Sequence, residues 1–212
     1  MRSLNEALIP SMVRWRAFVV MAASIVSACT TSGATRPAPI AVHDASGFTI
    51  TEKVRVGGEV RGDFERAVHL LDQKQNESAI ALLVKVTEAA PQLTSAHIDL
   101  GIAYGRVSDL ERAENSLKRA LELSPRHPVA HNELGILYRR MGRFEEARRS
   151  YEKALALYPD FHFARRNLAI LCDLYLADVS CALEHYGVYI QAVPDDEAAA
   201  IWIADLRTRA GR

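Results

Sequence analysis

Most of the chain repeats one pattern of apolar and polar positions at a fixed step along the sequence. The stretch 100–104 reads LGIAY, the stretch 134–138 reads LGILY, and Pro125 is matched by Pro159 at the same step. Apolar residues within each unit have helical spacing, and Pro ends the second helix of a unit, so the pattern predicts stacked helix pairs. Matched residues one step earlier are Ala67, Leu70, Ala79, Leu83, Val86 and Pro91, and those one step later are Leu168, Ala169, Cys172 and, after one inserted residue, Ala182, Tyr186 and Pro194.

These residues resemble the tetratricopeptide repeat, which has a period of about 34 residues. Its helix A carries Leu-Gly and an aromatic residue, and its helix B carries Ala, an aromatic residue and Ala before a closing Pro. The resemblance implies an all-α fold, a right-handed α-solenoid of four helix-turn-helix repeats over 59–194 with a concave face. Gly or Ala is expected where helices A and B approach closely. The expected units are 59–92, 93–127, 128–161 and 162–194, followed by a capping helix over 195–212 that begins after Asp195 and Asp196.

Two features depart from the repeat pattern. The Trp that the family carries early in helix A is replaced by His97, His131 and Arg165, so these positions are less hydrophobic than the pattern expects. Arg66 stands in the first repeat where the others carry Leu. A polar substitution there is expected of a terminal repeat with a solvated outer face.

Residues 1–28 are expected to form a secretory signal peptide. Arg14 and Arg16 precede an uncharged run over 17–26, which is too short to span a bilayer and is followed by small residues. Residues 26–29, Val-Ser-Ala-Cys, resemble the bacterial lipobox, which implies cleavage before Cys29 and a lipid on its sulfur. Met12 is the expected true start. The alternative is a buried core helix that ends in Cys.

The residue after Cys29 bears on the destination of the protein. It is Thr30 and not Asp. The sorting rule for such lipoproteins then implies the outer membrane, with the protein facing the periplasm. Retention in the inner membrane is the alternative.

Residues 29–58 are expected to form the lipidated Cys and a flexible linker, because Ser, Thr, Gly and Pro are frequent and no helical period is sustained. As a coil, such a linker spans about 30 Å. Along residues 48–56 apolar and polar side chains alternate, and several of these residues are β-branched. This alternation fits either an edge strand offered to a partner or an extended segment leading into the first helix.

Charge and composition do not point to nucleic acid. The 212 residues include 26 Lys and Arg against 26 Asp and Glu, which is ordinary globular composition and excludes collagen and whole-chain disorder. Arg139, Arg140 and Arg143 form a basic run, but Glu145 and Glu146 follow it closely. Nucleic acid is therefore not an expected partner.

No catalytic site, cofactor or metal is expected. The sequence has no Gly-rich phosphate loop, no Gly-x-Ser-x-Gly and no His-Glu-x-x-His. His127 and His131 stand four apart, but Pro128 begins the helix after His127, so the two rings are expected at a helix start and in a contact between repeats and not around a metal.

Cys172 and Cys181 are a candidate disulfide. The repeat register places them on either side of one turn, and an oxidising periplasm favours a bond between them. The alternative is two small buried residues.

Partners of this family usually lie on the concave face lined by helix A, where this sequence carries an apolar strip and an arginine cluster. That combination suits a partner helix or extended segment whose carboxylates the arginines bind. The Lys and Asn clamp of chaperone-binding members is not reproduced, because the polar sites include Asp99 and Glu133. Alternatively, Ile102, Ile136 and Ile170 pack between helices and the arginines form a solvated face. The expected partner-binding residues are Ile98, Ile102, Asn132, Ile136, Arg139, Arg140, Arg166, Ile170 and Asp173.

The sequence thus predicts a non-enzymatic, lipid-anchored scaffold that docks envelope proteins and helps to assemble or stabilise their complex. The resemblance to known repeat lipoproteins implies a pilus or secretion system, a peptidoglycan-enzyme system or a proton-driven motor system. A structural lipoprotein bound to the cell wall is the alternative. A periplasmic hydrolase using His131 or Cys172 is the less favoured one.

Overall fold

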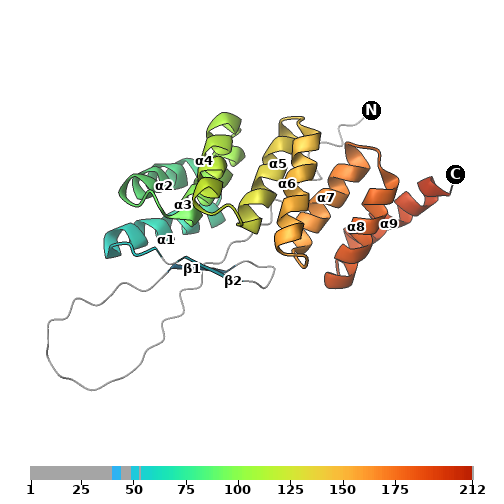
Figure 1. The fold of residues 1–212 in the computed structure, drawn as a ribbon, viewed down its shortest axis with the longest axis horizontal. Helices are drawn as coiled ribbons and strands as arrows, with labels where there is room; N and C mark the ends of the chain where they lie inside the picture. Colours follow the sequence, from blue (N-terminus) through green and yellow to red (C-terminus); the bar gives the residue numbers. More distant parts are fainter. Residues whose placement is uncertain (1–39, 44–48, 53, 212) are drawn as a thin grey trace, which may run out of the picture.

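The computed structural model describes residues 40–43, 49–52 and 54–211, and this part of the chain contains nine α-helices and two β-strands (Figure 1). The predicted signal peptide over 1–28 and Cys29 lie outside the described residues. No helix in the described ranges is long and apolar enough to cross a bilayer. The helices are α1 (Gly58–Asp72), α2 (Asn76–Ala89), α3 (Thr94–Arg106), α4 (Leu110–Leu123), α5 (Pro128–Arg140), α6 (Phe144–Leu157), α7 (His162–Leu174), α8 (Val179–Ala192) and α9 (Glu197–Ala210).

The helices pack as a row of pairs. Helices α1, α3, α5 and α7 contact one another in sequence and form the helix A layer, while each of α2, α4, α6 and α8 packs against the helix A before it and the helix that follows. Helix α9 packs on α8 at the end of the row (Figure 1). The predicted all-helical array of four helix pairs and a capping helix is confirmed.

Glycine allows the close approach of helices A and B in the two central repeats. A Cβ placed on Gly101 would lie 2.6 Å from Cγ of Leu117, and one placed on Gly135 would overlap the ring of Tyr151. Leu117 and Tyr151 are themselves buried in the core. The sequence-based expectation that Gly is needed where the helices approach is confirmed at both positions.

The turns between paired helices share one backbone conformation. Lys74, Ser108, Gly142 and Ala177 have φ values of 62°, 64°, 74° and 53°, in the left-handed region. The first three stand at the same position of successive repeats, whereas Ala177 lies one residue further along its repeat. The extra residue predicted for the fourth repeat is therefore confirmed as an insertion in its turn.

The segment before α1 is more regular than the predicted linker. Strands β1 (Ile40–His43) and β2 (Thr49–Glu52) pair antiparallel, with Ile40 opposite Glu52. Ile50 and Val54 are partly buried against the core, and Val56 is buried within it. The alternation seen in the sequence thus serves a hairpin formed within this chain and an extended lead into α1.

Side chains of aspartate cap several helices. The carboxylates of Asp109, Asp178 and Asp196 accept hydrogen bonds from backbone N–H groups in the first turns of α4, α8 and α9. Each bond satisfies a donor that the helix itself leaves unpaired. The predicted cap on the last helix is confirmed, and Asp196 provides it.

Candidate functional site

All nine residues expected to bind partners lie on helices α3, α5 and α7 of the helix A layer, but they differ in exposure. Three are buried: Ile98, Asn132 and Ile170. Five are half-buried: Ile102, Ile136, Arg139, Arg166 and Asp173. Arg140 is exposed. We call the surface that carries Ile102, Ile136, Arg139, Arg140 and Leu174 the inner face.

The isoleucines divide into core and surface residues. Ile98 and Ile170 belong to the hydrophobic core and are not accessible to a partner in this structure. Ile102 and Ile136 pack against that core but keep part of their side chains exposed. The side chains of Ile98 and Ile170 are therefore used entirely in packing between helices. Those of Ile102 and Ile136 are used only partly in this way and keep exposed surface.

Asn132 has a structural role in the same layer. Its Oδ1 accepts a hydrogen bond from Nδ2 of Asn167 at 3.0 Å, which joins α5 to α7. Its own Nδ2 donates to Oε1 of Glu133 at 3.1 Å. The side chain is fully buried, so these bonds satisfy polar atoms that water does not reach.

Arginines at the ends of α3, α5 and α9 form a periodic set of contacts with the helix A layer, which we call the arginine ladder. Each reaches back to the helix before it in the layer, at the same position of the repeat. A guanidinium that donates to a neighbouring helix end is occupied in holding the array together. The contacts run from Arg106 to the carbonyl oxygen of Leu71 at 2.8 Å, from Arg140 to the carbonyl oxygen of Gly105 at 2.5 Å, and from Arg209 to Oδ1 of Asp173 at 2.6 Å.

Arg166 and Asp173, two further predicted residues, are engaged by α9 and the turn before it. Arg166 lies 3.5 Å from Asp196 and 5.4 Å from the ring centre of Trp202. Asp173 is paired with Arg209, as part of the arginine ladder. Both residues therefore make contacts within the chain, with the capping helix or with the turn before it.

Arg139 is differently placed. Its Nη1 donates to the hydroxyl of Tyr175 at 3.4 Å, and its guanidinium carbon lies 5.6 Å from the centre of that ring. No carboxylate among the described residues pairs with it, and its buried Nε has no hydrogen-bond partner there. Tyr175 also packs on Phe144, with ring centres 4.9 Å apart.

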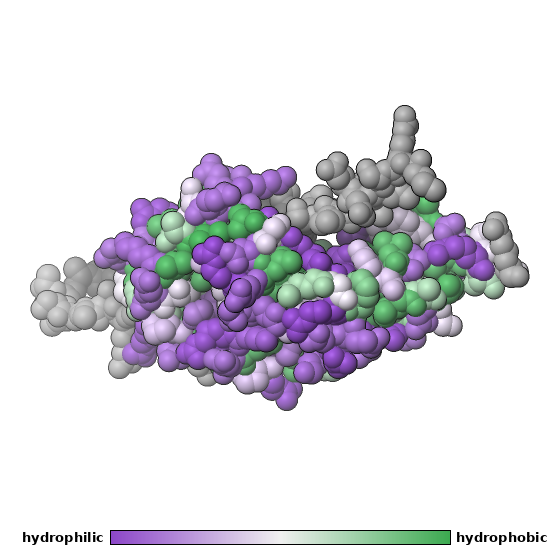
Figure 2. Space-filling view, turned by 90° about the horizontal axis from the view of Figure 1, so that it is seen from above, coloured by the Kyte–Doolittle hydropathy of each residue, from purple (hydrophilic) through white to green (hydrophobic). Residues whose placement is uncertain are grey.

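Exposed large apolar side chains occur towards the C-terminal end. Leu174 is 52% exposed and Tyr175 42%, and they are the last residue of α7 and the one that follows it. Val188 on α8 and Ile201 on α9 are also exposed. Figure 2 shows hydrophobic side chains on one face over the C-terminal helices and also over the N-terminal half, with polar side chains around them. Leu174 and Tyr175 are not among the residues expected to bind partners, although the repeat register aligns Leu174 with Arg140.

The other end of the helix A layer is acidic and buried. Glu52 of β2 accepts hydrogen bonds from the backbone N–H of Ser95 at 2.7 Å and from its hydroxyl at 3.4 Å. Desolvation raises the pKa of Glu52, and the Ser95 bonds partly oppose this. Burial raises the pKa of Asp99 on the same helix as Ser95 to about 8, with Arg106 opposing the shift.

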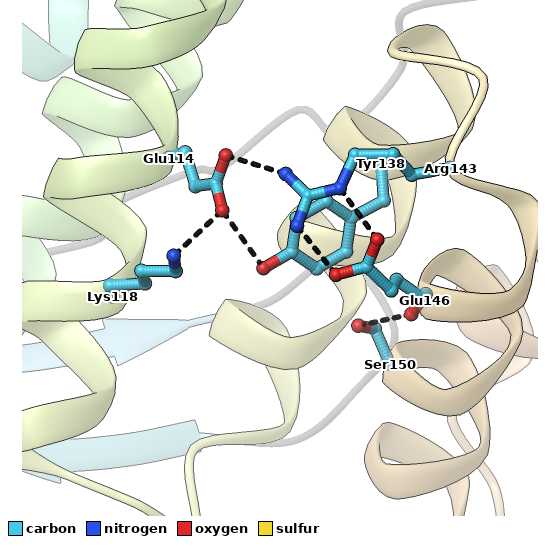
Figure 3. Close-up of polar contacts among 6 residues, drawn as sticks. All are labelled: Glu114, Lys118, Tyr138, Arg143, Glu146 and Ser150. Atoms are coloured by element: carbon cyan, nitrogen blue, oxygen red, sulfur yellow. Dashed lines mark hydrogen bonds and ion pairs between the residues drawn. The ribbon is translucent and has the colours of Figure 1, made fainter.

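Arg143, the last residue of the basic run seen in the sequence, is paired inside the molecule (Figure 3). Arg143 donates to Glu114 of α4 at 2.8 Å and to Glu146 at 2.6 Å, and its guanidinium lies 4.2 Å from the ring centre of Tyr138. Glu114 also accepts from Lys118 at 2.7 Å. This network joins α4 to the turn between α5 and α6, so these charges are used within the chain.

The residues that replace the family's Trp share one contact. His97 and His131 hydrogen-bond through Nε2 to the carbonyl oxygens of Pro91 and Pro125, six residues back, and Arg165 donates to Pro159 in the same way.

His127 instead accepts a hydrogen bond from the backbone of Ala130 at the start of α5, and burial lowers its pKa to about 4. Within the described residues no group of His, Cys, Asp and Glu side chains is arranged to hold a metal.

Cys172 and Cys181 form a disulfide across the turn of the fourth repeat, with their Cα atoms 5.8 Å apart. Next to it, Arg148 of α6 reaches Asp178 at 3.0 Å. The bond closes the loop that carries Leu174 and Tyr175, so it restrains the end of the inner face.

Removing this disulfide is expected to lower the free energy of unfolding. A Cys172→Ser, Cys181→Ser variant should lose about 2 kcal/mol, because a short closed loop restricts the unfolded chain. Urea unfolding with and without reductant measures the loss. Reductant should destabilise the wild type and leave the variant unchanged; equal responses would contradict a bond in the folded protein.

Solved tetratricopeptide repeat structures have the same fold as this chain, and part of the chain matches the family profile. The family profile "Tetratricopeptide repeat" matches residues 94–160. A solved thermophilic TPR protein from Thermus thermophilus is 23% identical, with a TM-score of 0.64, and the match covers 71% of this chain and 82% of that one. The pilF protein of Pseudomonas aeruginosa is 22% identical, with a TM-score of 0.66, covering 71% of this chain and 68% of that one.

A third structure contains a ligand. The first TPR of Spaghetti (RPAP3), bound to the HSP90 peptide SRMEEVD, is 24% identical over 57% of this chain and 97% of that one, with a TM-score of 0.54. No curated protein matches this sequence. At these identities the structural likeness concerns the fold.

Proposed function

We propose that this chain, an all-helical array with the tetratricopeptide repeat fold, is a scaffold for protein–protein interaction and serves as a non-enzymatic adaptor of the cell envelope. It docks one or more envelope proteins on its inner face and helps to assemble or stabilise their complex. The candidate systems are those expected from the sequence: a pilus or secretion system, a peptidoglycan-enzyme system or a proton-driven motor.

One observation carries this proposal. Ile102 and Ile136 lie at matching positions on the contacting helices α3 and α5, and both keep part of their apolar surface exposed. Arg139 follows Ile136 by one turn on α5, and the exposed Leu174 is the last residue of α7. An apolar strip next to a cation suits the recognition of a partner segment. The peptide held by a protein of the same fold supports this interpretation.

The proposal also includes the location of the protein, which is the cell envelope. The lipobox-like residues 26–29 support cleavage before Cys29 and attachment of lipid to its sulfur. Thr30 supports delivery to the outer membrane, with the array facing the periplasm. Anchoring raises the local concentration of the scaffold near envelope partners.

Photo-crosslinking in living cells tests the docking face. The full chain carries a photoreactive residue at Ile136, and a matched chain carries it at the exposed Arg149 of α6. We expect one discrete adduct with an envelope protein from Ile136 and none from Arg149. Equal labelling at both positions, or none at either, would contradict docking on the inner face. Sedimentation with peptidoglycan that does not depend on Ile136 would favour the structural alternative.

The lipid anchor has its own test. Cells fed an alkyne-bearing fatty acid should label the wild-type protein, and the Cys29→Ser protein should be unlabelled and leave the membrane fraction. A labelled Cys29→Ser protein would overturn this assignment without affecting the docking face.

A further inference from the structure

The arginine ladder is interrupted at one helix of the array. Arg106 and Arg140 occupy the same position of successive repeats, and the equivalent position of the next repeat is Leu174. One repeat later, beyond the inserted residue, the ladder resumes with Arg209. No arginine from α7 therefore reaches back over the end of α5, where Arg139 lies.

Leu174 at this interruption leaves apolar surface exposed. Leu174 and Tyr175 are 52% and 42% exposed, although both are large apolar side chains. Tyr175 is held in place by Phe144, at 4.9 Å between ring centres, and the Cys172–Cys181 disulfide closes the loop that contains both residues. A held, exposed apolar surface is a feature of recognition sites.

Arg139 lies beside this apolar surface with unused hydrogen-bonding capacity. Its Nε is buried and has no partner among the described residues, and no carboxylate of that part of the chain pairs with it. The hydroxyl of the fully buried Tyr151 interacts with the guanidinium of Arg139, but the geometry of that interaction falls short of a normal hydrogen bond. Buried polar atoms without partners are uncommon in folded proteins and call for an explanation.

Other arginines of the helix A layer are already engaged. Arg140 donates to Gly105, and Arg166 pairs with Asp196. Arg139 is therefore the cation beside the interruption that has no carboxylate partner among the described residues. A partner that complements its charge would present a carboxylate.

We propose that Arg139, Leu174 and Tyr175 form a docking site for a partner segment that presents a carboxylate next to a large apolar side chain. The carboxylate accepts hydrogen bonds from Arg139, and the apolar side chain packs on Leu174 and Tyr175. Both groups must belong to one ligand, because the cation and the apolar surface are adjacent. This inference rests on the proposed scaffold function and names the chemistry of its partner.

The test uses the full chain, labelled with ¹⁵N in arginine, and follows the Nε–H signal of Arg139 by NMR. The probes are short peptides in a Gly-Ser background that carry a central Leu-Asp, Leu-Asn or Gly-Asp pair. The Leu-Asp peptide should shift the signal to saturation. The Leu-Asn and Gly-Asp peptides should bind about tenfold more weakly, because each lacks one of the two groups.

Two variants and one control assign the site. Arg139→Lys keeps the charge but not the planar fork, and Leu174→Ser changes an exposed residue, which leaves the fold intact. Each should weaken the Leu-Asp peptide about tenfold by fluorescence anisotropy. Arg149→Lys should not change it. The melting temperature of each variant verifies folding.

Equal affinity for the Leu-Asp and Leu-Asn peptides, no saturable binding of either, or indifference to both variants would overturn the proposal. If these results came with a discrete adduct from Ile136 in cells, the scaffold function would stand and its partner would bind elsewhere on the inner face. If the adduct were also absent, both proposals would fail.

Discussion

Gly135→Ala is expected to lower the free energy of unfolding by about 3 kcal/mol or more, because it forces a methyl group into a filled core. The added Cβ would overlap the Cδ1 and Cε1 atoms of Tyr151 and lie 2.9 Å from Cζ. Tyr151 is fully buried and its ring is rigid, so it has no room to move aside. Helices α5 and α6, which this glycine lets pack closely, would have to separate.

Matched glycine variants isolate this effect. Gly62 and Gly187 lie inside helices α1 and α8, and a Cβ at either would meet nothing within 4 Å. Gly62→Ala and Gly187→Ala should raise stability by about 0.5–1 kcal/mol, since alanine favours the helix. Gly101→Ala should be intermediate, because the two closest atoms belong to the more flexible Leu117 and the backbone oxygen of Ala113 lies further away, at 3.2 Å. Urea unfolding measures all four; a Gly135→Ala protein as stable as Gly187→Ala would contradict the helix contact.

Asp99→Asn is expected to stabilise the protein increasingly as the pH rises. The pKa of Asp99 is about 8 in the folded chain, against an ordinary value of 3.8, because burial and the carboxylates of Glu52 and Glu133 disfavour its charge. The folded state therefore holds a proton that the unfolded state has released. The stability due to the neutral carboxyl is complete at low pH and is lost as the pH rises towards 8.

The size of this effect follows from proton linkage. Between about pH 6 and about pH 8 the wild type should lose about 2 kcal/mol of stability relative to Asp99→Asn. Urea unfolding at several pH values gives the two curves. Asp195→Asn, at an exposed site, is the control and should run parallel to the wild type. Parallel curves for Asp99→Asn would show that the carboxyl is charged in the folded state.

His127 makes the protein less stable as the pH falls, whereas Asp99 makes it less stable as the pH rises. Its pKa is lowered from 6.5 to about 4, so the unfolded chain takes up a proton first as the pH falls, and the folded state loses stability between these values. The comparison of Asp99→Asn with the wild type cancels this contribution, because both proteins carry His127.

Much of the array was predictable from sequence because its contacts are local and periodic. Each repeat packs on its neighbours through the same positions, so Gly135 and Tyr151 could be assigned to facing helices from the register alone. The inserted residue near Ala177 was visible as a repeat longer by one position. Asp196 was predictable as a cap because the capping bond lies within one turn.

Which residues of the inner face are exposed, and which are hydrogen-bonded within the chain, was less predictable from the sequence. Arg139 and Arg140 are neighbours in sequence, yet Arg140 binds the end of the preceding helix while Arg139 lies beside Tyr175. Ile98 and Ile102 are equally apolar, yet only Ile102 keeps exposed surface. Side-chain direction and the neighbouring helix decide these differences, and a pattern of residue types contains neither.

The sequence by itself determined the repeat, the number and order of the helices and the glycines at their closest contacts, because these depend on residue type at a fixed period. Tertiary structure decided that Arg140 binds the preceding helix while Arg139 lies beside Tyr175, and how Glu52 of the hairpin meets Ser95 of α3. These contacts depend on the direction of each side chain and on how whole elements stack in space, which residue type at a fixed period does not specify.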